Sequence, residues 1–476
     1  MNNVNTLHTN LLRSMQKNAE LVAIVDQNKF LSYADLFSAV MSRTEELKQA
    51  GITKGERVLI VGEKGCDMLS TILACLFCGV VYVPLESPIP EARIETIVAN
   101  IHASACFDVK MGLKKFNSST THHTDDILIF YTSGSTGQPK GVRINEKNIL
   151  NFVTWVQQQF SIRSDDRFCA HAPWHFDLSI LDIYTALLSG ASIHCVPPIL
   201  KTFPYQMAQW LSKEQISVVY MVPTAIRHLV KHGQWTQKLH SSLRCILFAG
   251  EPYALAELQQ LRLAFPEIII ANLYGPTETN VCTWCEIPDS TKLSQWTDVP
   301  IGHALPYFSL FVWDKNGDIL NEEDKEGELI CAGNGVSPGY INDAHSDNFF
   351  SYYNQLAYRT GDLVRITNKG LVFLGRKDRQ IKLYGYRIDP HEIEAHLRSH
   401  PSIKDAAICV YQQQLIAFIV TDVDCSEKGI SRYCLHYLPN YCCPKKFIFL
   451  EELPRTASEK IDYQKLLARE YSHEIA

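Results

Sequence analysis

The sequence predicts an α/β protein: a large N-terminal lobe of mostly parallel sheets flanked by helices, with a β-rich subdomain, and a small α+β C-terminal lobe. Three observations predict this class. Short apolar runs alternate with amphipathic segments over the first three-quarters of the chain, which indicates parallel sheets covered on both faces. After residue 300, short strand-like runs are joined by Gly, Asn and Asp turns. A charged stretch at 375–387 then precedes the final α+β segment.

The order of the elements follows from these runs. Buried strands are expected at 58–61, 80–85, 127–132, 217–223, 245–250 and 268–276. Apolar residues recur at helical spacing between them, which predicts helices over 90–101, 146–160 and 254–265. The β-rich part is expected at 308–320, 327–333 and 371–375, and a further helix begins near Pro390. In parallel sheets of this kind, ligands bind beyond the carboxyl ends of the strands.

Composition excludes several classes of protein. The chain has 476 residues, of which 46% are hydrophobic and 20% charged, as in a globular protein rather than a disordered or coiled-coil one. Its net charge of −6 argues against a nucleic-acid binder. Residues 1–18 lack the apolar stretch of a signal peptide. The longest apolar run, 71–85, is shorter than the about 18–20 residues of a membrane helix. We therefore expect a cytoplasmic protein without membrane association.

The 15 cysteines are expected to be reduced thiols that fill the core. Most lie inside apolar runs, where Cys acts as a small hydrophobic residue. Two CxxC pairs, Cys75/Cys78 and Cys282/Cys285, have the local spacing of zinc ligands. They lie far apart in the sequence, and the first falls in a predicted buried helix, so a structural zinc site is disfavoured.

One segment dominates the chemistry, YTSGSTGQPKGV at 131–142, directly after a predicted strand. Its glycines, hydroxyl residues and lysine suit a loop that wraps phosphates with backbone N–H groups and side-chain hydroxyls. It is not a Walker A loop, because Pro139 precedes Lys140 and Gly141 follows it. The alternative is a flexible Ser/Gly turn. The residues expected to hold phosphates are Thr132, Ser133, Gly134, Ser135, Thr136, Gly137 and Lys140.

This loop closely resembles the phosphate loop of the adenylate-forming superfamily, which includes acyl-CoA ligases, luciferases and the amino-acid adenylation domains of peptide synthetases. The resemblance covers nearly the whole chain. Further motifs follow in the family's order: LSYADL (31–36), LACLFCGVVYVPLESPIPEAR (73–93), FDLSILDIYTALLSG (176–190), NLYGPTETNVC (272–282), GELICAGNGVSPGY (327–340), YRTGDLV (358–364), GRKDRQIKLYGYRIDPHEIE (375–394), LPNYCCP (438–444) and LPRTASEKIDY (453–463).

The resemblance implies ATP and Mg²⁺ as cofactors and assigns residues to them. An enzyme that activates a carboxylate must hold ATP, neutralise its charge and present the acid for in-line attack. Glu278 would ligate the metal and Thr277 would contact the α-phosphate. Asn272 would bind the adenine edge, Tyr274 and Phe373 would stack on adenine, and Asp362, assisted by Arg376, would bind the ribose hydroxyls. Taken singly, these residues have ordinary alternatives as core or turn residues.

Two residues near the C-terminus are assigned in the same way. Lys460 matches the lysine that bridges the substrate carboxylate and the phosphate, although the usual Asn-Gly before it is replaced by Ser458-Glu459. Asp378 matches the hinge residue of the family. The chain is therefore predicted to consist of an AMP-binding domain over 1–378 and a mobile C-terminal domain over 379–476.

The resemblance implies that Asp177 separates amino-acid adenylation domains, in which a carboxylate at this position pairs with the substrate ammonium, from acyl- and aryl-acid ligases, which do not need one. The alternative is an N-cap of a helix over 178–189. The remaining specificity positions of the family are almost wholly apolar here, which favours a small aliphatic amino acid. The substrate-binding residues are expected to be Asp177, Leu178, Leu181, Tyr220, Leu247, Ala249, Gly250, Leu273, Val281 and Cys282.

The ordered pocket set resembles that of stand-alone prolyl adenylation enzymes. The prediction is therefore an ATP-dependent ligase that activates L-proline and passes it to the phosphopantetheine thiol of a separate peptidyl carrier protein, feeding a pyrrole-containing metabolite. The closest alternative is a D-alanine or other small amino acid:carrier-protein ligase. An acyl- or aryl-CoA ligase and a non-catalytic amino-acid sensor are further alternatives.

Overall fold

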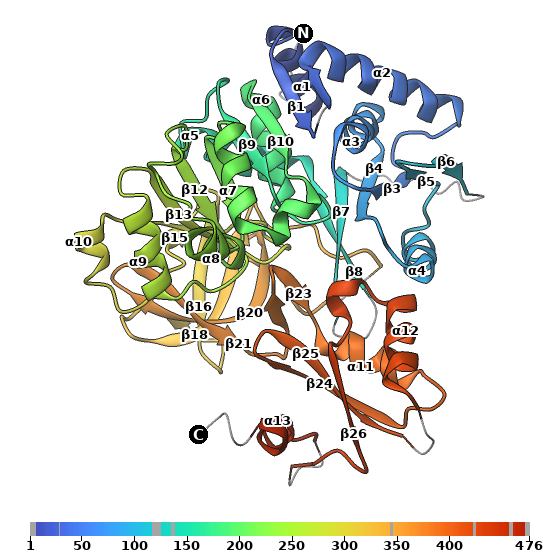
Figure 1. Ribbon diagram of the computed structural model, residues 1–476, viewed down its shortest axis with the longest axis vertical. Helices are drawn as coiled ribbons and strands as arrows, with labels where there is room; N and C mark the ends of the chain where they lie inside the picture. Colours follow the sequence, from blue (N-terminus) through green and yellow to red (C-terminus); the bar gives the residue numbers. More distant parts are fainter. Residues whose placement is uncertain are drawn as a thin grey trace. The chain divides into compact units, whose positions relative to one another are not determined.

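The structure, a computed structural model, describes residues 6–27, 29–116, 125–134, 139–342, 346–421, 425–456 and 460–471. Two compact units are present. The first contains Met1–Ser87, Ile101–Phe130 and Gly141–Lys377, and the second contains Pro88–Asn100, Tyr131–Lys140 and Asp378–Ala476. Each is described separately below (Figure 1).

A nine-stranded sheet forms the centre of the first unit, with parallel pairing from β1 through β13 and antiparallel strands at both edges. Its strands in spatial order are β15 (His303–Ala304), β14 (Thr283–Glu286), β13 (Ile269–Tyr274), β12 (Cys245–Phe248), β11 (Val218–Met221), β9 (Arg167–Ala170), β10 (Ser192–Cys195), β1 (Val22–Asp26) and β2 (Lys29–Ser32).

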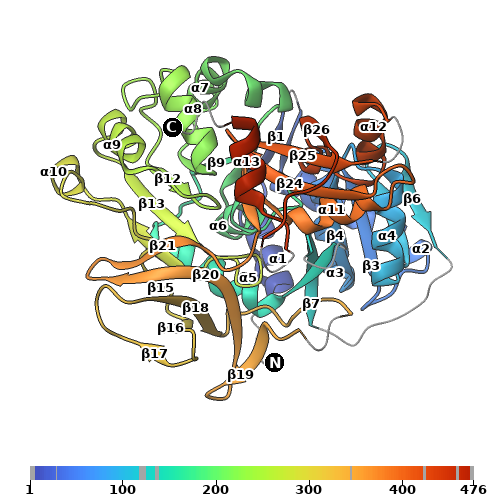
Figure 2. The same cartoon turned by 90° about the horizontal axis from the view of Figure 1, so that it is seen from below.

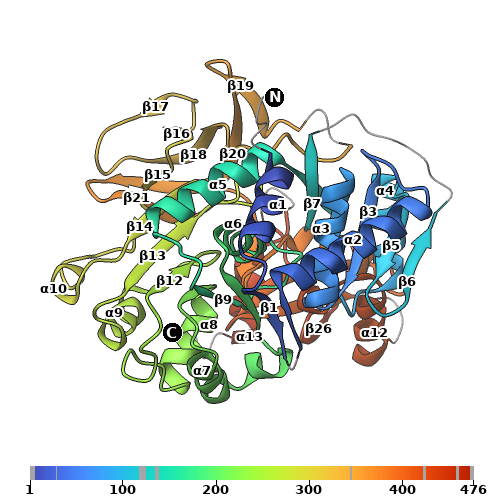
Figure 3. The same cartoon turned by 90° about the horizontal axis from the view of Figure 1, so that it is seen from above.

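Helices cover both faces of this sheet, as expected for buried parallel strands. Side chains alternate between two cores along each strand: Val219, Ile246 and Ile270 belong to one core, and Tyr220 and Leu247 belong to the other. The first core is closed by α7 (Pro204–Lys213), α8 (Pro223–His232), α9 (Leu255–Ala264) and α10 (Ser290–Leu293). The second contains residues from α1 (Leu7–Lys17), α2 (Tyr33–Gln49), α3 (Cys66–Cys78), α5 (Glu146–Gln159) and α6 (Ala186–Ser189). Figures 2 and 3 show α9 and α5 on opposite sides of β12 and β13.

A second mostly parallel sheet has the order β6 (Gly112–Lys115), β5 (Ala105–Asp108), β3 (Arg57–Gly62), β4 (Val81–Glu86), β7 (Asp126–Thr132) and β8 (Lys140–Asn145). The β-rich subdomain is an antiparallel sheet built from β16 (Phe308–Trp313), β17 (Ile319–Leu320), β18 (Glu326–Gly333), β19 (Phe349–Tyr352), β20 (Gln355–Thr367) and β21 (Gly370–Arg376).

The second unit contains α4 (Glu91–Ile101), the hairpin β22 (Ile381–Leu383) and β23 (Tyr386–Ile388), and the three-stranded sheet β24 (Asp405–Tyr411), β25 (Gln414–Val420) and β26 (Lys446–Leu450). One face of that sheet packs on α11 (Pro390–Arg398), α12 (Glu427–Tyr437) and the 3₁₀-helix η3 (Asn440–Cys442), and the other packs on α13 (Tyr463–Tyr471). Figure 1 shows α13 on the opposite side of the sheet from α11 and α12.

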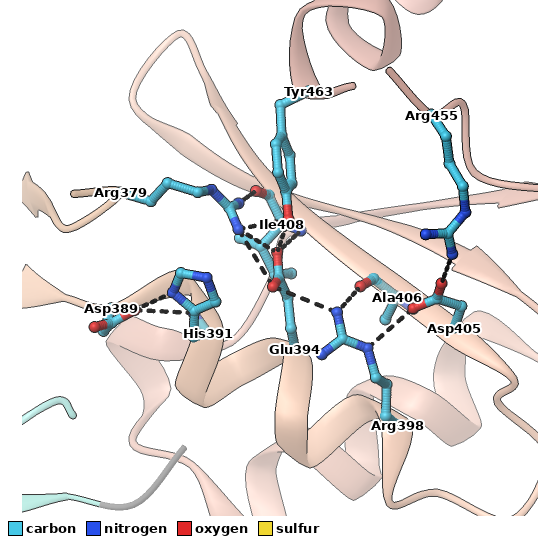
Figure 4. A network of polar contacts seen from close by, with 10 residues as sticks. All are labelled: Arg379, Asp389, His391, Glu394, Arg398, Asp405, Ala406, Ile408, Arg455 and Tyr463. Atoms are coloured by element: carbon cyan, nitrogen blue, oxygen red, sulfur yellow. Dashed lines mark hydrogen bonds and ion pairs between the residues drawn. The ribbon is translucent and has the colours of Figure 1, made fainter. Parts of the chain in front are cut away.

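A polar network around Glu394, which is 1% exposed, joins these elements (Figure 4). Arg379 donates to the Glu394 carboxylate at 3.0 Å, and its guanidinium lies 3.5 Å from the Tyr463 ring centroid. The backbone N–H of Ile408 donates to the same carboxylate at 2.9 Å. Arg455 pairs with Asp405 at 3.3 Å. The segments on both sides of 457–459 are thereby fixed to the sheet.

The predicted fold class is confirmed. The expected buried strands are β3, β4, β7, β11, β12 and β13, and their ends differ from the predicted ones by at most two residues. The expected helices are α4, α5 and α9. The helix expected over 178–189 differs, because it contains a five-residue π-helix, η1 (Leu181–Thr185), before α6. All 15 cysteines are free thiols, and 12 of them are buried. Among the described residues, no helix is long and apolar enough to cross a membrane.

Candidate active site

Three of the predicted amino-acid pocket residues lie on one face of the nine-stranded sheet. Tyr220 on β11 pairs in register with Leu247 on β12, and Leu273 on β13 belongs to the same core. Eight of the predicted pocket positions are buried and lie in that core: Leu178, Leu181, Tyr220, Leu247, Ala249, Leu273, Val281 and Cys282. Gly250 follows β12 with a φ of +92°, a conformation that favours glycine. These residues therefore belong to one apolar core, in which Tyr220, Leu247 and Leu273 form an apolar layer on one face of the sheet.

Asp177 is the acidic residue at this layer. It lies in the turn before η1, and its backbone carbonyl accepts the N–H of Ile180 at 3.0 Å. Burial raises the pKa of the Tyr220 phenol well above its usual range, and the charge of Asp177 raises that pKa further. The carboxylate and the phenol are therefore close enough to interact electrostatically. The π-helix η1 follows Asp177, and π-helical turns inside α-helices are often found at functional sites.

The predicted nucleotide residues of the first unit lie on β13, β20 and β21. Asp362, which is 1% exposed, pairs in register with Arg376, whose guanidinium donates to its Oδ1. The Tyr274 hydroxyl donates to Asp362 Oδ2. The Tyr274 and Phe373 ring centroids are 6.2 Å apart. Asn272 donates its amide N–H to the Pro300 carbonyl at 2.8 Å. Asp362, Arg376, Tyr274 and Phe373 form one polar and aromatic group, in which the Asp362 carboxylate is the central acceptor, whereas Asn272 is bonded to the Pro300 carbonyl.

Glu278 lies in the tight turn after β13. The Tyr340 hydroxyl donates to Glu278 Oε1 at 2.6 Å, and the carboxylate is 1% exposed. Gly275 is required in this turn, because a Cβ there would lie 2.2 Å from the Asn280 carbonyl oxygen. Thr277, half-buried beside Glu278, accepts the Asn280 N–H at its carbonyl at 3.3 Å. Tyr340, the last residue of GELICAGNGVSPGY (327–340), was not among the predicted site residues.

Glu278 fits a Mg²⁺ ion carried by a polyphosphate. A carboxylate and a neighbouring hydroxyl are the hard oxygen donors that Mg²⁺ prefers. In the part of the chain that the structure describes, no cluster of three or more His, Cys, Asp or Glu could form an all-protein cage. Mg²⁺ typically takes one or two carboxylates, with water and substrate phosphates completing its coordination.

The phosphate loop belongs to the second unit, and Ser135, Thr136 and Gly137 lie outside the described residues. The Ser133 hydroxyl donates to the Arg387 carbonyl at 2.8 Å and accepts the Asp389 N–H at 2.8 Å. Thr132 ends β7, Gly134 is buried, and Lys140 begins β8. The expected contact of Ser133 is to phosphate, whereas in the structure its hydroxyl is bonded to the backbone at the end of β23.

Lys460 and Asp378 also belong to the second unit. Lys460 is exposed, and its carbonyl accepts the Thr456 N–H at 2.7 Å. The substituted turn residues Ser458 and Glu459 lie outside the described residues. Asp378 accepts the Gln380 N–H at 3.1 Å and is the residue at which the C-terminal segment of this unit begins.

Comparison with known proteins defines the class. The AMP-binding enzyme family model matches residues 11–126 and 109–341, and the AMP-binding enzyme C-terminal domain matches 392–460. The chain belongs to the AMP-binding enzyme family, and it is an AMP-forming ligase.

The curated relatives include amino acid:carrier-protein ligases for two different amino acids. An L-proline–[L-prolyl-carrier protein] ligase of Pseudomonas fluorescens is 32% identical, over 96% of this chain and 97% of that protein. A D-alanine–D-alanyl carrier protein ligase of Bacillus licheniformis is 30% identical, over 95% of this chain and 97% of that protein. Among solved structures, the Vibrio cholerae adenylation domain AlmE in complex with glycyl-adenosine-5'-phosphate has a TM-score of 0.85 at 24% identity, with 98% of each chain covered, and shows the fold alone.

Proposed function

We propose that this AMP-forming ligase activates L-proline with ATP and transfers the prolyl group to the phosphopantetheine thiol of a separate peptidyl carrier protein. The observation that carries the proposal is the apolar layer around Tyr220 with Asp177 as its acid. Such a layer offers little to a charged or amide side chain, and a carboxylate beside it favours a substrate with an ammonium group. The prolyl ligase of Pseudomonas fluorescens supports proline. Pyrrole formation would follow from the resemblance of the pocket residues to those of prolyl adenylation enzymes.

The first half-reaction forms an acyl-phosphate bond. The proline carboxylate attacks the α-phosphorus of ATP, and pyrophosphate leaves with the electron pair of the broken P–O bond. Thr277 would donate to the α-phosphate, and the loop Thr132–Lys140 would hold the departing phosphates. Mg²⁺ at Glu278 would neutralise phosphate charge. Lys460 would bridge the two reacting groups and stabilise the negative charge that develops between them.

The second half-reaction forms the thioester. The thiolate of the carrier attacks the prolyl carbonyl, and AMP leaves as the phosphate oxygen takes the electron pair. We propose that Asp378 acts as the hinge between an AMP-binding domain, 1–378, and a mobile domain, 379–476. The beginning of the last segment of the second unit at Asp378 supports this position. A cytoplasmic location accords with this chemistry.

Pyrophosphate exchange over a panel of acids tests the substrate. With labelled pyrophosphate and ATP, we expect exchange to be strongest with L-proline and weaker with D-alanine, glycine and L-valine. The D-alanine ligase among the relatives makes D-alanine the specific alternative. Exchange that is strongest with D-alanine would replace the substrate assignment. Exchange with aryl acids but no amino acid would indicate a CoA-type ligase, and binding without exchange would indicate a sensor.

Asp362→Asn is expected to raise the KM for ATP by about 10–100-fold, since each hydrogen bond to a charged group contributes about 1.5–3 kcal/mol. The KM for the amino acid should change little. Glu328→Gln is a matched control, because Glu328 is also a buried carboxylate of the β-rich sheet, paired with Arg359 and Lys377. Equal effects of both variants would show that Asp362 only stabilises the sheet.

A further inference from the structure

Lys64 binds the loop that leads to Asp177. It lies between β3 and α3, and its Nζ donates to the backbone carbonyls of Ala170, His171 at 2.7 Å and Ala172 at 3.3 Å. A lysine ammonium has three N–H donors, so three consecutive carbonyls use all of them. These carbonyls lie where β9 ends and the loop to Asp177 begins. The start of that loop is therefore anchored by a charge from the neighbouring parallel sheet.

Asp182 supplies the opposite charge. It lies in the π-helix η1 and is 1% exposed. Among the described residues, neither of its carboxylate oxygens has a hydrogen-bond partner. A buried carboxylate without donors is costly unless a cation compensates for it. Burial raises the pKa of Asp182 well above its usual range, and the positive charge of Lys64 lowers that pKa. Lys64 is thus the cation that acts on this carboxylate.

Both carboxylates act on the same pocket residue. After desolvation, the charges of Asp177 and Asp182 both raise the pKa of the buried Tyr220 phenol. Lys64 favours the ionised form of Asp182, because its positive charge lowers the Asp182 pKa, whereas without Lys64 this buried carboxyl would be the neutral acid. With Asp182 matched by Lys64, Asp177 alone remains to bind an ammonium group.

We infer that Lys64 is a positioning residue for amino-acid recognition: it holds the Ala170–Ala172 carbonyls so that the loop presents Asp177, and it matches the charge of Asp182. The inference rests on the proposed function, because it takes Asp177 as the acceptor of the substrate amino group. Lys64 acts through Asp177 and needs no contact with the substrate.

Steady-state exchange kinetics of three variants test the inference. Lys64→Met is expected to raise the KM for the amino acid by about 10–100-fold, through the loss of hydrogen bonds from a charged donor, and to leave the KM for ATP within about twofold. Lys64→Arg, which keeps the charge and the donors, should retain most of the affinity. Lys201→Met is the matched control, because Lys201 is an exposed lysine whose charge also acts on Lys64. Equal changes in both KM values, or the same loss in Lys201→Met, would overturn the inference.

A pH profile tests the inference even if Lys64→Met does not fold. Burial lowers the pKa of Lys64 to about 8, and the titratable groups that interact with its charge are Asp182, Glu86, His171, Cys169, Cys195 and Lys201. Lys64 is protonated below that pH, so kcat/KM for the amino acid should fall as the pH rises above about 8. Asp182→Asn removes a charge that raises the Lys64 pKa, so kcat/KM should begin to fall at a lower pH than in the wild type. Lys201→Met removes a charge that lowers the Lys64 pKa, so the fall in kcat/KM should not begin at a lower pH. If kcat/KM of Asp182→Asn begins to fall at the same pH as that of the wild type, the inference is overturned.

The two proposals fail separately. All kinetics are measured with the amino acid that the wild-type enzyme activates best in the panel. If that amino acid is D-alanine, the assignment of proline fails, while the Lys64 variants still test the positioning of Asp177. If the assignment of proline holds and Lys64→Met leaves the amino-acid KM unchanged, the inference alone fails.

Discussion

Asp177→Asn is expected to reduce amino-acid-dependent pyrophosphate exchange by about 10²–10³-fold. Removal of one partner of a buried ion pair costs about 3–5 kcal/mol, because the other charge is left uncompensated. A bound substrate would cover the side chain at position 177. Without the carboxylate, the substrate ammonium would face an apolar layer that contains Leu247 and Leu273, with no negative charge to compensate for it. Asn keeps the shape of the side chain and removes its charge. The measurement is exchange with the preferred amino acid, together with the KM for ATP, which should stay unchanged.

A substrate analogue separates charge recognition from damage to the pocket. Cyclopentanecarboxylate has the ring and carboxylate of proline without its nitrogen, so it gains nothing from Asp177. The ratio of proline exchange to exchange with this analogue should fall in Asp177→Asn. Asp165→Asn is the control, because Asp165 is an exposed acid in the loop before β9. Equal loss with both acids would show that Asp177 supports the turn rather than the ammonium.

The strands of the pocket could be predicted from the sequence, because a buried parallel strand is a continuous apolar run. The common face of Tyr220 and Leu247 follows from the two-residue period of a strand and from the register between neighbours. The motifs assign Asp177 to the substrate ammonium and Glu278 to the metal, and both assignments stay predictions. They gave no signal for the π-helical geometry of Leu181–Thr185, which depends on packing rather than on local sequence.

Long-range polar contacts were the part that could not be predicted. Tyr340 reaches Glu278 across 62 positions of the chain, and Lys64 reaches the Ala170 carbonyl across 106. When a lysine donates to backbone carbonyls, the residues that accept can be of any type, because every residue has a backbone carbonyl. The sequence therefore contains no pattern that predicts such a contact. The same holds for Ser133, whose partners are the backbone groups of Arg387 and Asp389.

Lys460→Ala is expected to reduce adenylation by at least about 10²–10³-fold, the usual cost of removing one preorganised group that stabilises charge in a transition state. The variant should fold, because Lys460 is exposed and only its backbone carbonyl is bonded, to Thr456. Its flanking segments are fixed independently by Arg455–Asp405 and by the Arg379 contact with Tyr463. ATP binding, measured by calorimetry, should be retained.

The second half-reaction makes this test specific. Prolyl-AMP supplied directly should still be converted to the carrier thioester by Lys460→Ala, because that step needs no attack on the α-phosphorus. Lys465→Ala is the matched control, an exposed lysine that follows in α13 and should leave both half-reactions unchanged. If Lys460→Ala keeps full pyrophosphate exchange, Lys460 has no part in adenylation. If it loses both half-reactions together with ATP binding, its role is general to the nucleotide site.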